Sequence, residues 1–541
     1  MIAYMKRRLF LLLPALLAAC STVPPAPPPL PMLTQEQRAE RWWTDVATLA
    51  DDRMEGREAG TPGYDRAAAY VISRLTEIGL QPAGTAGFLQ PVAFEEQFVD
   101  HARSSVSLVH RGRALKLDLP GDMIIGRGGG RRPQSIEAPL VFVGYGLHIP
   151  EAGHDDFAGV DLKGKIAVFV GGGPANISGA LKSHARSERT KLLAERGAVG
   201  TLSLTTAKAV EVPWARSMAQ ASQSGMYLAD PALRDVKVPF FTGSLNTASA
   251  QKIFAHAGST FAQISALADA SKPLPRIALN QSLRANVTTR HRSLTSPNVV
   301  ARIPGSDPRL AAEHVVFSAH LDHLGVGTPI KGDGLYNGAM DNAAGVAGLL
   351  DIARMTMARP TRPRRSMIFL FVTAEEKGLL GSQYFALRPT VPKRAIVANL
   401  NFDMALPIFP LRSVIALGAE QSSLGPLTAE VGRTMGLPVL PDPFPDRNSF
   451  IRSDQYSFIR EGVPALAFKF GFAKGSPEAK LEQAWRSTRY HAPSDDLSQP
   501  VERLDAVRLH DFVAELGWRI ANGPQRPAWN PDSFFARFQE R

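Results

Sequence analysis

Histidines and carboxylates that could form a metal site are spread over the C-terminal half of the chain. His320 and Asp322 follow a short apolar run, and residues two apart on extended backbone point to the same side. Asp322 is therefore expected to hydrogen-bond the His320 ring, as residues behind a metal ligand often do. The other candidates are Asp341, the adjacent pair Glu375 and Glu376, Asp403 and His491.

These residue types indicate a hydrolase with two metal ions. Histidine nitrogens and carboxylate oxygens suit zinc, and one shared carboxylate can bridge two ions about 3.5 to 4 Å apart. Because adjacent side chains diverge, one glutamate of the pair 375–376 can bind metal while its neighbour stays free as a base. For single residues the alternatives stay open, since Asp341 alone could be a helix N-cap and the glutamate pair a solvated acidic turn.

The segments around these candidates predict alternating strands and helices. Several candidates follow the C-terminal ends of apolar runs, which in an open α/β sheet is the edge where ligands bind. We therefore expect an α/β fold in which helices cover both faces of the sheet. Strands are expected at 315–318, 367–372, 396–400 and 463–470, and helices at 342–357 and 379–387.

Changes in composition divide the chain of 541 residues into parts. A helical segment precedes a long stretch of short apolar runs broken by Gly and Pro, which predicts a separate β-rich domain inserted into the main one. The expected parts are a signal peptide (1–20), a Pro-rich linker (21–34), the first part of the main domain (35–97), the insertion (98–288), the second part (289–525) and a tail (526–541).

The N-terminus has the features of a secretory signal. Three basic residues at 6–8 precede an apolar run at 9–19, which is shorter than the roughly 20 residues that span a bilayer. The run ends at Cys20, the single cysteine of the chain, so an intramolecular disulfide is excluded. This end resembles the bacterial lipoprotein signal, in which the cysteine is lipidated, although an ordinary signal with an incidental cysteine is the alternative.

The lipoprotein interpretation predicts where the protein works. A lipidated Cys20 would anchor the chain to a membrane of the bacterial cell envelope, with the folded part facing the periplasm. The prolines of residues 24–31 fit a stiff tether between anchor and domain. Ser21 stands where an inner-membrane retention signal would carry Asp, which favours the outer membrane.

Charge and other motifs exclude several function classes. The net charge of +11 is modest for this length, and the densest basic run, 359–365, lies among prolines without aromatic residues. No nucleic-acid partner is therefore expected. Gly159 to Lys165 has the spacing of a phosphate-binding loop, but Ile166 follows where a hydroxyl should hold magnesium. Neither a G-x-S-x-G elbow nor an H-E-x-x-H helix occurs.

At these residues the chain resembles the co-catalytic di-zinc exopeptidases. That family includes secreted leucine aminopeptidases, glutamate carboxypeptidase and the inactive transferrin-receptor ectodomain. The order and spacing of the shared blocks make the resemblance specific, and residues 54–61 also look like the family's opening. The matching blocks are 318–325, 337–345, 374–382, 401–404, 452–454 and 490–491.

The resemblance implies a mixed-sheet, phosphorylase/hydrolase-like fold with two zinc ions per chain. One zinc would be bound by His320, Asp341 and Asp403. The other would be bound by Asp341, Glu376 and His491, so that Asp341 bridges the two ions.

Further roles are also implied by the resemblance alone. Glu375 would be the general base, Asp322 would orient His320, and Tyr490 would donate a hydrogen bond to the oxyanion. Arg452 is a candidate substrate-binding residue. The insertion resembles a protease-associated domain that walls the cleft and screens peptides, and a passive spacer is the alternative.

The function expected on this basis is an aminopeptidase that trims N-terminal residues from peptides. Carboxylates crowded around the metals can hold the ammonium of a free N-terminus, whereas a carboxypeptidase needs a committed cation, preferably an arginine. The alternatives are a carboxypeptidase, a glutaminyl cyclase-like enzyme and a receptor-like binding protein without activity. The sequence predicts neither the side-chain preference nor the oligomeric state.

Overall fold

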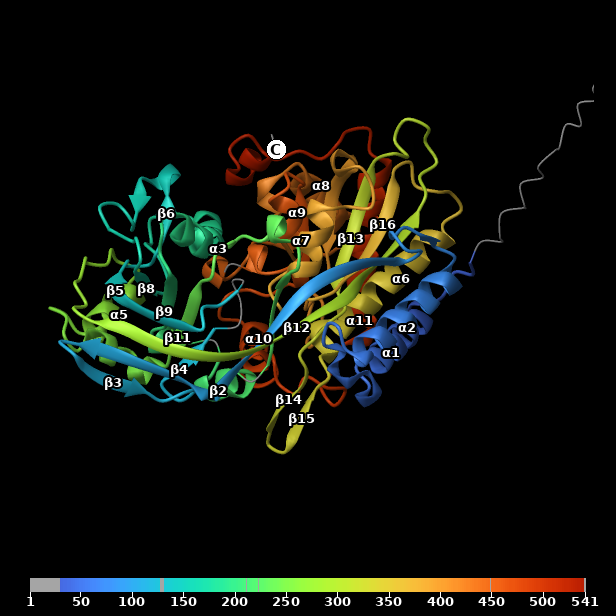
Figure 1. Cartoon of the computed structure of the whole chain (residues 1–541). Coiled ribbons are helices and arrows are strands. Elements are labelled where there is room, and N and C mark those ends of the chain that lie inside the picture. The colour runs from blue at the N-terminus through green and yellow to red at the C-terminus, as the bar shows by residue number, and fades with distance from the viewer. Residues whose placement is uncertain (1–29, 127–130, 211, 222, 448, 540–541) are drawn as a thin grey trace, which may run out of the picture.

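The computed structural model of the chain describes residues 30–126, 131–210, 212–221, 223–447 and 449–539 (Figure 1). The predicted signal peptide, with Cys20, lies outside the described residues, as does most of the predicted linker. Within the described part of the chain, no helix combines the length and the apolar composition needed to cross a membrane.

The described chain begins with two capped helices. α1 (Gln35–Leu49) starts after Thr34, whose hydroxyl accepts from the backbone N–H of Gln37 while the Gln37 side chain accepts from the N–H of Thr34. α2 (Pro62–Ile78) begins with a proline, which suits a first turn, and ends at Gly79 with φ 86°. An N-cap of this kind stabilises a helix by about 1 kcal/mol. Two helices thus form the helical segment that was predicted before the insertion.

A mixed sheet runs through the main domain in the order β19-β18-β20-β17-β13-β16-β12. β13, β16, β17 and β20 are parallel, whereas β12 and β18 run antiparallel to their neighbours. All residues of β13, β16 and β17 are buried, as expected for strands covered on both faces. The bounds are β12 (Ser282–Ile303), β13 (His314–His320), β16 (Ser366–Val372), β17 (Ile396–Asn401), β18 (Val414–Leu417), β19 (Val439–Leu440) and β20 (Ala465–Phe470).

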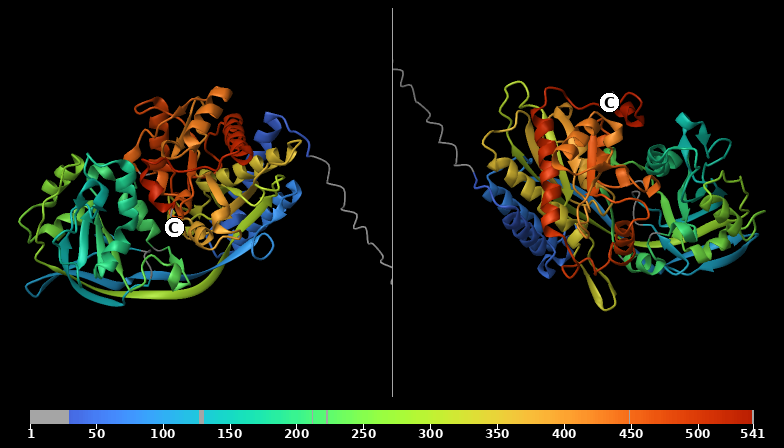
Figure 2. Two further views of the ribbon diagram at one scale, coloured as in Figure 1. Left: turned by 90° about the horizontal axis from the view of Figure 1, so that it is seen from above. Right: turned by 180° about the vertical axis from the view of Figure 1, so that it is seen from behind.

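Helices cover both faces of this sheet, which confirms the predicted α/β class (Figures 1 and 2). On one face, the N-terminal helices and two later ones form a large core around Phe317 and Phe369 of the sheet. On the other face, Phe385 and Phe458 pack against the alternate strand residues. The later helices are α6 (Ala344–Ala358) and α11 (Arg503–Asn522) on the first face and α7 (Leu380–Leu387) and α9 (Gln455–Ile459) on the second.

The insertion is joined to the main domain by two long strands. β2 (Leu89–His110) and β12 pair antiparallel from Leu89 opposite Val299 to Val109 opposite Ser282. Both strands continue from one domain into the other, as Figure 2 shows. The predicted boundaries at 97/98 and 288/289 therefore fall inside these strands, because the chain changes domain without a break in pairing.

The inserted domain contains helices as well as strands, so the expectation of a β-rich domain was incomplete. Its strands β5, β8, β9 and β11 are mutually parallel, and helices lie between them in the sequence. The first of these helices buries Lys182, Ser183 and Arg189, so it lacks the apolar stripe by which a helix is found in a sequence. That the insertion is a protease-associated domain stays a prediction. The elements are β5 (Ser135–Phe142), β8 (Ile166–Val170), β9 (Gly200–Leu204), β11 (Phe241–Leu245), α3 (Gly179–Glu195), α4 (Trp214–Gln220) and α5 (Phe261–Asp269).

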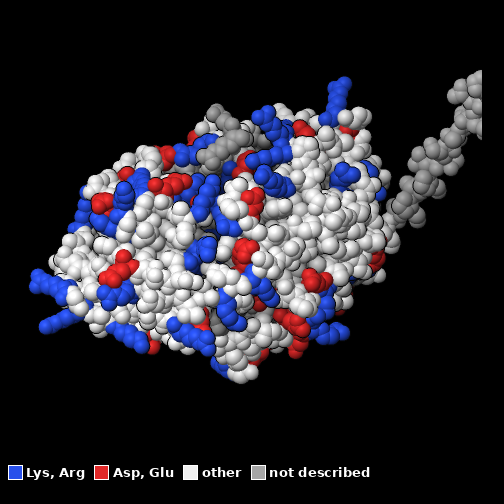
Figure 3. Space-filling view, in the orientation of Figure 1, with Lys and Arg blue, Asp and Glu red and all other residues white. Residues whose placement is uncertain are grey.

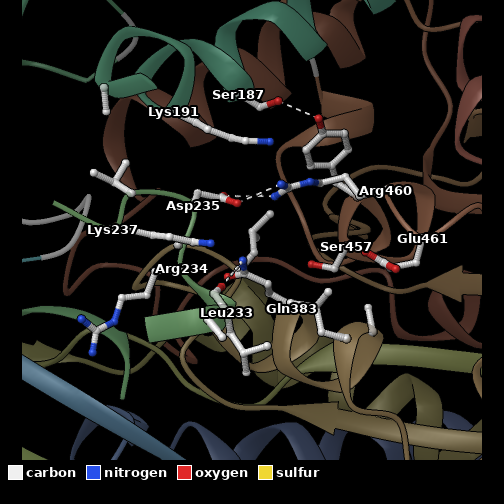
Figure 4. A pocket seen from close by; sticks show the side chains of 18 of the residues that line it. Ser187, Lys191, Leu233, Arg234, Asp235, Lys237, Gln383, Ser457, Arg460 and Glu461 are labelled. Atoms are coloured by element: carbon white, nitrogen blue, oxygen red, sulfur yellow. Dashed lines mark hydrogen bonds and ion pairs between the residues drawn. The ribbon is translucent and has the colours of Figure 1, made fainter. Parts of the chain in front are cut away.

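Polar contacts join the inserted domain to the main domain. The Ser187 hydroxyl of α3 lies 2.6 Å from the Tyr456 hydroxyl of α9, and Asp235 accepts from the Arg460 guanidinium at 2.9 and 3.1 Å (Figure 4). A cavity of about 640 Å³ lies beside these contacts between the domains. The insertion therefore rests on the main domain through side chains as well as through its connecting strands.

The surface and the C-terminal tail complete the fold. On the face drawn in Figure 3, acidic side chains lie among the basic ones. The predicted tail, 526–541, is packed as far as it is described, with Trp529, Phe535 and Phe538 buried in one cluster. Arg537 of the tail also forms an ion pair with Glu151 of the inserted domain.

Candidate metal centre

The candidate residues meet at the C-terminal edge of three neighbouring parallel strands. His320 is the last residue of β13, Glu375 and Glu376 follow β16, and Asp403 follows β17. Asp341 lies in the turn before α6. His491 arrives from the other side, in the loop after α10 (Pro477–Thr488).

Asp341 stands between two groups of ligand-type side chains. One of its oxygens, Oδ1, lies 3.2 Å from Nε2 of His320, which is also 3.3 Å from Oδ1 of Asp403. The other oxygen, Oδ2, lies 3.3 Å from Nε2 of His491, which is also 3.2 Å from Oε2 of Glu376. We call His320, Asp341 and Asp403 the first donor group.

His323, which the sequence analysis left aside, also belongs to the site. Its Nδ1 lies 2.8 Å from Oε1 of Glu376, and the ring is fully buried. Ligand atoms of His323, Asp341 and Glu376 all lie within 4.8 Å of one another, as do those of the first donor group. The sequence feature that could have identified His323 was its place in the family-matching block 318–325. The second donor group is therefore Asp341, Glu376, His491 and His323.

The expected bond between the Asp322 carboxylate and the His320 ring is wrong. β13 ends at His320, so the alternation of an extended strand does not reach Asp322. Nδ1 of His320 lies 3.0 Å from the backbone carbonyl oxygen of Asp322 instead. The Asp322 carboxylate accepts from the backbone N–H groups of Glu375 and Glu376 at 3.0 and 3.3 Å. Asp322 thus contacts the histidine through its main chain and the glutamate pair through its side chain.

Glu375 lies beside both donor groups without belonging to either. It lines a small pocket of about 60 Å³ together with His320, Asp341, Asp403 and His491. Tyr490 and Arg452, which were also predicted from the sequence, line the same pocket, and so do Lys469 and Arg486, which were not. The ring of Tyr490 stacks on that of His491, with 3.9 Å between the ring centroids.

The charges of the site shift its pKa values strongly. Burial raises the pKa of the Glu375 carboxyl well above its ordinary value. The charge of Glu376 raises this pKa further, whereas that of His320 lowers it. Burial also opposes ionisation of Asp341, yet His320 and His491 hold its pKa well below its ordinary range. Against burial, Glu376 and Asp341 raise the pKa of His491 to about 9. The carboxylates of the site therefore stabilise a positive charge placed between them.

The loops that carry the ligands are held by buried polar residues. Arg57, in the block 54–61, donates to the backbone carbonyls of Leu321, Asn337 and Gly338 at 3.0, 2.6 and 3.0 Å. The guanidinium thereby joins the His323 loop to the loop before Asp341. Gly338 has φ 60°, and a Cβ there would lie 2.5 Å from the His323 ring.

Asp495 holds Asp341 itself. Its two carboxylate oxygens accept from the backbone N–H groups of Met340 and Asp341, both at 3.0 Å. Neither Arg57 nor Asp495 was selected from the sequence, because their contacts depend on the paths of distant loops.

The donor groups fit zinc. Oδ2 of Asp341, Oε1 of Glu376 and both ring nitrogens of His323 are buried and make no hydrogen bond of good geometry among the described residues. Their closest charged neighbours are one another and His491, at 2.8 and 3.3 Å. Unpaired buried carboxylate oxygens are costly unless a cation compensates them. Histidine nitrogens and carboxylate oxygens are the ligands that zinc prefers at such sites.

Comparisons with known proteins identify a peptidase family over the segment that contains these residues. Residues 298–516 match the model of peptidase family M28. The chain is 28% identical to the probable leucine aminopeptidase 2 of Aspergillus oryzae over 229 residues, 39% of this chain and 42% of that protein. It is 23% identical to the probable lipoprotein aminopeptidase LpqL of Mycobacterium tuberculosis over 486 residues, 86% of this chain and 78% of that protein.

The chain spans about half the length of several curated relatives that it matches. Among solved structures, the aminopeptidase from Aneurinibacillus sp. strain AM-1 has the same fold, with a TM-score of 0.53 and 18% identity. The similarity covers 92% of this chain and 98% of that one. The matched segment, residues 298–516, contains both donor groups and Glu375 and belongs to peptidase family M28.

Proposed function

We propose that the protein is a zinc aminopeptidase that binds two zinc ions and removes N-terminal residues from peptides. The observation that carries the proposal is the central position of Asp341, with one carboxylate oxygen near each donor group. The relatives named aminopeptidases support the same reaction class.

The two donor groups would each hold one zinc ion, and in the second group Oδ2 of Asp341 and Oε1 of Glu376 are buried oxygens that would bind it. His320, Asp341 and Asp403 would bind one ion, and Asp341, Glu376 and His491 the other. His323 is close enough to Glu376 to serve the same position. When bound, a zinc pair lowers the pKa of a water molecule and polarises a carbonyl group.

The chain's own residues would handle the proton and the developing charge. Glu375 accepts the proton of the attacking water as the oxygen bonds to the scissile carbonyl carbon. It then passes this proton to the leaving amine nitrogen as the C–N bond breaks. Asp322 fixes the backbone of Glu375 through its carboxylate. Tyr490, which lines the same pocket, donates its O–H to the oxyanion.

The pocket is also lined by the cations Arg452, Lys469 and Arg486, and a cation could bind the C-terminal carboxylate of a peptide. Lys469 donates to the backbone carbonyls of Asp403 and Met404 at 3.1 and 3.2 Å, and Arg486 forms an ion pair with Glu482. Both are thus occupied by the protein. Arg452 likewise donates to the backbone carbonyl of Arg447 at 3.4 Å, so each of the three cations has a partner within the protein. The carboxylates of the pocket, by contrast, suit an N-terminal ammonium.

Blocked peptides test which end enters. We expect hydrolysis of peptides with a free N-terminus, whether or not the C-terminus is amidated, and no hydrolysis after N-acetylation. Cleavage of N-acetylated peptides that requires a free C-terminal carboxylate would show a carboxypeptidase. Absence of hydrolysis in the zinc-loaded protein would favour a binding protein.

We also propose that Cys20 is lipidated and holds the enzyme in the bacterial cell envelope, facing the periplasm. The apolar run before the cysteine and the relative named a lipoprotein aminopeptidase support this.

A further inference from the structure

A short segment of the inserted domain contacts the loop that carries Tyr490 and His491. Arg216 of α4 donates to the backbone carbonyls of Arg486 and Tyr490 at 3.3 and 2.7 Å, and to that of Ser487 at 2.5 Å. One guanidinium from the insertion therefore holds three carbonyls on the His491 side of the site.

The position of Arg216 suits the end of helix α10. Arg486 and Ser487 lie in the last turn of this helix, where carbonyl groups lack partners within the helix and carry partial negative charge. A cation at such an end is favourable and fixes the direction in which the chain leaves the helix. The chain leaves here toward His491.

Gln220, one turn further along α4, holds His491 itself. Its side-chain N–H donates to the backbone carbonyl of His491 at 3.2 Å. His491 has φ 54°, a left-handed conformation that residues other than glycine rarely adopt. The contact supports this backbone, which directs the imidazole to Asp341 and Glu376.

The same segment reaches two further loops of the second donor group. Gln223 donates to the backbone carbonyl of Leu324, the residue after His323, at 2.9 Å. Lys377, the residue after Glu376, donates its ammonium to the carbonyl and hydroxyl of Ser224 at 3.2 and 3.3 Å. Contacts from the described residues of this segment, 214–221, 223 and 224, thus converge on the chain beside His491, His323 and Glu376.

We propose that residues Arg216 and Gln220 are positioning residues for the second donor group, so that the insertion sets the affinity of one of two zinc sites. The inference rests on the proposed function. The first donor group is held from within the main domain, where Lys469 donates to the Asp403 carbonyl and the Asp322 carbonyl contacts His320. Loss of the two positioning side chains should therefore affect the two ions unequally.

The variants Arg216→Ala, Gln220→Ala and their combination test the proposal on the full chain. In zinc competition with a chromophoric chelator, we expect the double variant to release one ion at about tenfold lower chelator concentration and the other as in the wild type. In the metal-free protein, we expect faster amide hydrogen exchange at residues 486–492. Arg216→Lys should show weaker forms of both changes than Arg216→Ala, since it keeps a cation at the helix end.

Arg234→Ala is the matched control. This arginine also lies in the inserted domain and donates to two backbone carbonyls, those of Leu228 and Ala229, both at 2.6 Å. Wild-type affinity for both ions and unchanged exchange at 486–492 in the double variant would overturn the proposal. So would equal weakening of both ions, or the same effect in Arg234→Ala. If the wild type binds no zinc, the proposed function fails, while the exchange measurement still tests the contact.

Discussion

Glu375 and Glu376 are adjacent in sequence but lie in different surroundings. Glu376 contacts His323 and His491, whereas Glu375 lies beside the donor groups. We expect Glu375→Gln to keep both zinc ions and to lower kcat by about 10²- to 10⁴-fold, because the substitution removes the proposed base and leaves the candidate ligands intact. Glu376→Gln should lower zinc affinity. Zinc content and kcat of both variants check this, and exchanged phenotypes would reverse the assignment.

Asp322 offers a second prediction for a single residue. Each of its two oxygens accepts from one backbone N–H group, and an asparagine would put an NH2 group, which cannot accept, in the place of one of them. We expect Asp322→Asn to destabilise the metal-free protein by about 1 to 3 kcal/mol, the cost of an unpaired buried donor. Urea unfolding measures this, and an unchanged midpoint would show that the two bonds contribute nothing.

The clustering of the candidate ligands was predictable, but several of their contacts were not. His320, Asp341 and Asp403 stand in blocks whose order and spacing are specific. The contact of His320 with the Asp322 carbonyl depends on where β13 stops, which no periodicity gives. No role was predicted for His323 because a histidine at the surface or in the core is the default interpretation, despite its place in the block 318–325.

Helices α1, α6 and α11 are tied together by a buried ionic network. Arg38 donates to both oxygens of Asp351 at 3.1 and 2.7 Å, and Nδ1 of His510 lies 2.9 Å from the same carboxylate. Burial opposes ionisation of Asp351, yet His510 and Arg38 hold its pKa below the ordinary value. The network packs α6, whose start follows Asp341, against its neighbours.

We expect Asp351→Asn to destabilise the protein by up to about 3 to 5 kcal/mol at pH 7, because the buried Arg38 loses its buried charge partner and keeps only the partly exposed Asp511. A lowered pKa in the folded state means stability that is present above the ordinary pKa of 3.8 and lost as the pH falls below it. The difference between variant and wild type should therefore shrink at pH 3. Urea unfolding at both values checks this.

The control for this prediction is Asp511→Asn. Asp511 also accepts from Arg38, but its side chain is 24% exposed, against 7% for Asp351. Asp511→Asn should therefore lower the free energy of unfolding much less than Asp351→Asn does. Equal losses for both variants, or a loss that does not depend on pH, would contradict the argument from burial.

Elements with continuous apolar runs were predictable, and elements with polar burial were not. The strands near 315–318, 367–372 and 396–400 are buried on both faces, so their sequences are mostly apolar. α3 buries lysine, serine and arginine side chains, which hides its periodicity.

At the scale of the molecule, composition predicted two domains but not how they meet. The contacts between them are polar, as between Ser187 and Tyr456 or Asp235 and Arg460, and such pairs leave no pattern in a sequence. The two connecting strands, β2 and β12, also run through the predicted boundaries.

The anchor is a prediction for the whole molecule. We expect Cys20→Ser to move the protein from the membrane fraction to the soluble fraction, because the acyl chains supply the attachment. Cell fractionation followed by immunoblotting measures this, with a known lipoprotein as the control. Unchanged membrane association of the variant would contradict lipidation at Cys20.

The most direct test of the account is the zinc content of the purified protein and of Asp341→Ala, determined by mass spectrometry with peptide hydrolysis assayed alongside. We predict two zinc ions per wild-type chain and loss of hydrolysis on chelation, with recovery when zinc is returned. Asp341→Ala should lose more zinc than a variant of any other ligand, because Asp341 faces both donor groups. Full activity in the metal-free protein, or two tightly bound zinc ions in Asp341→Ala, would contradict the account.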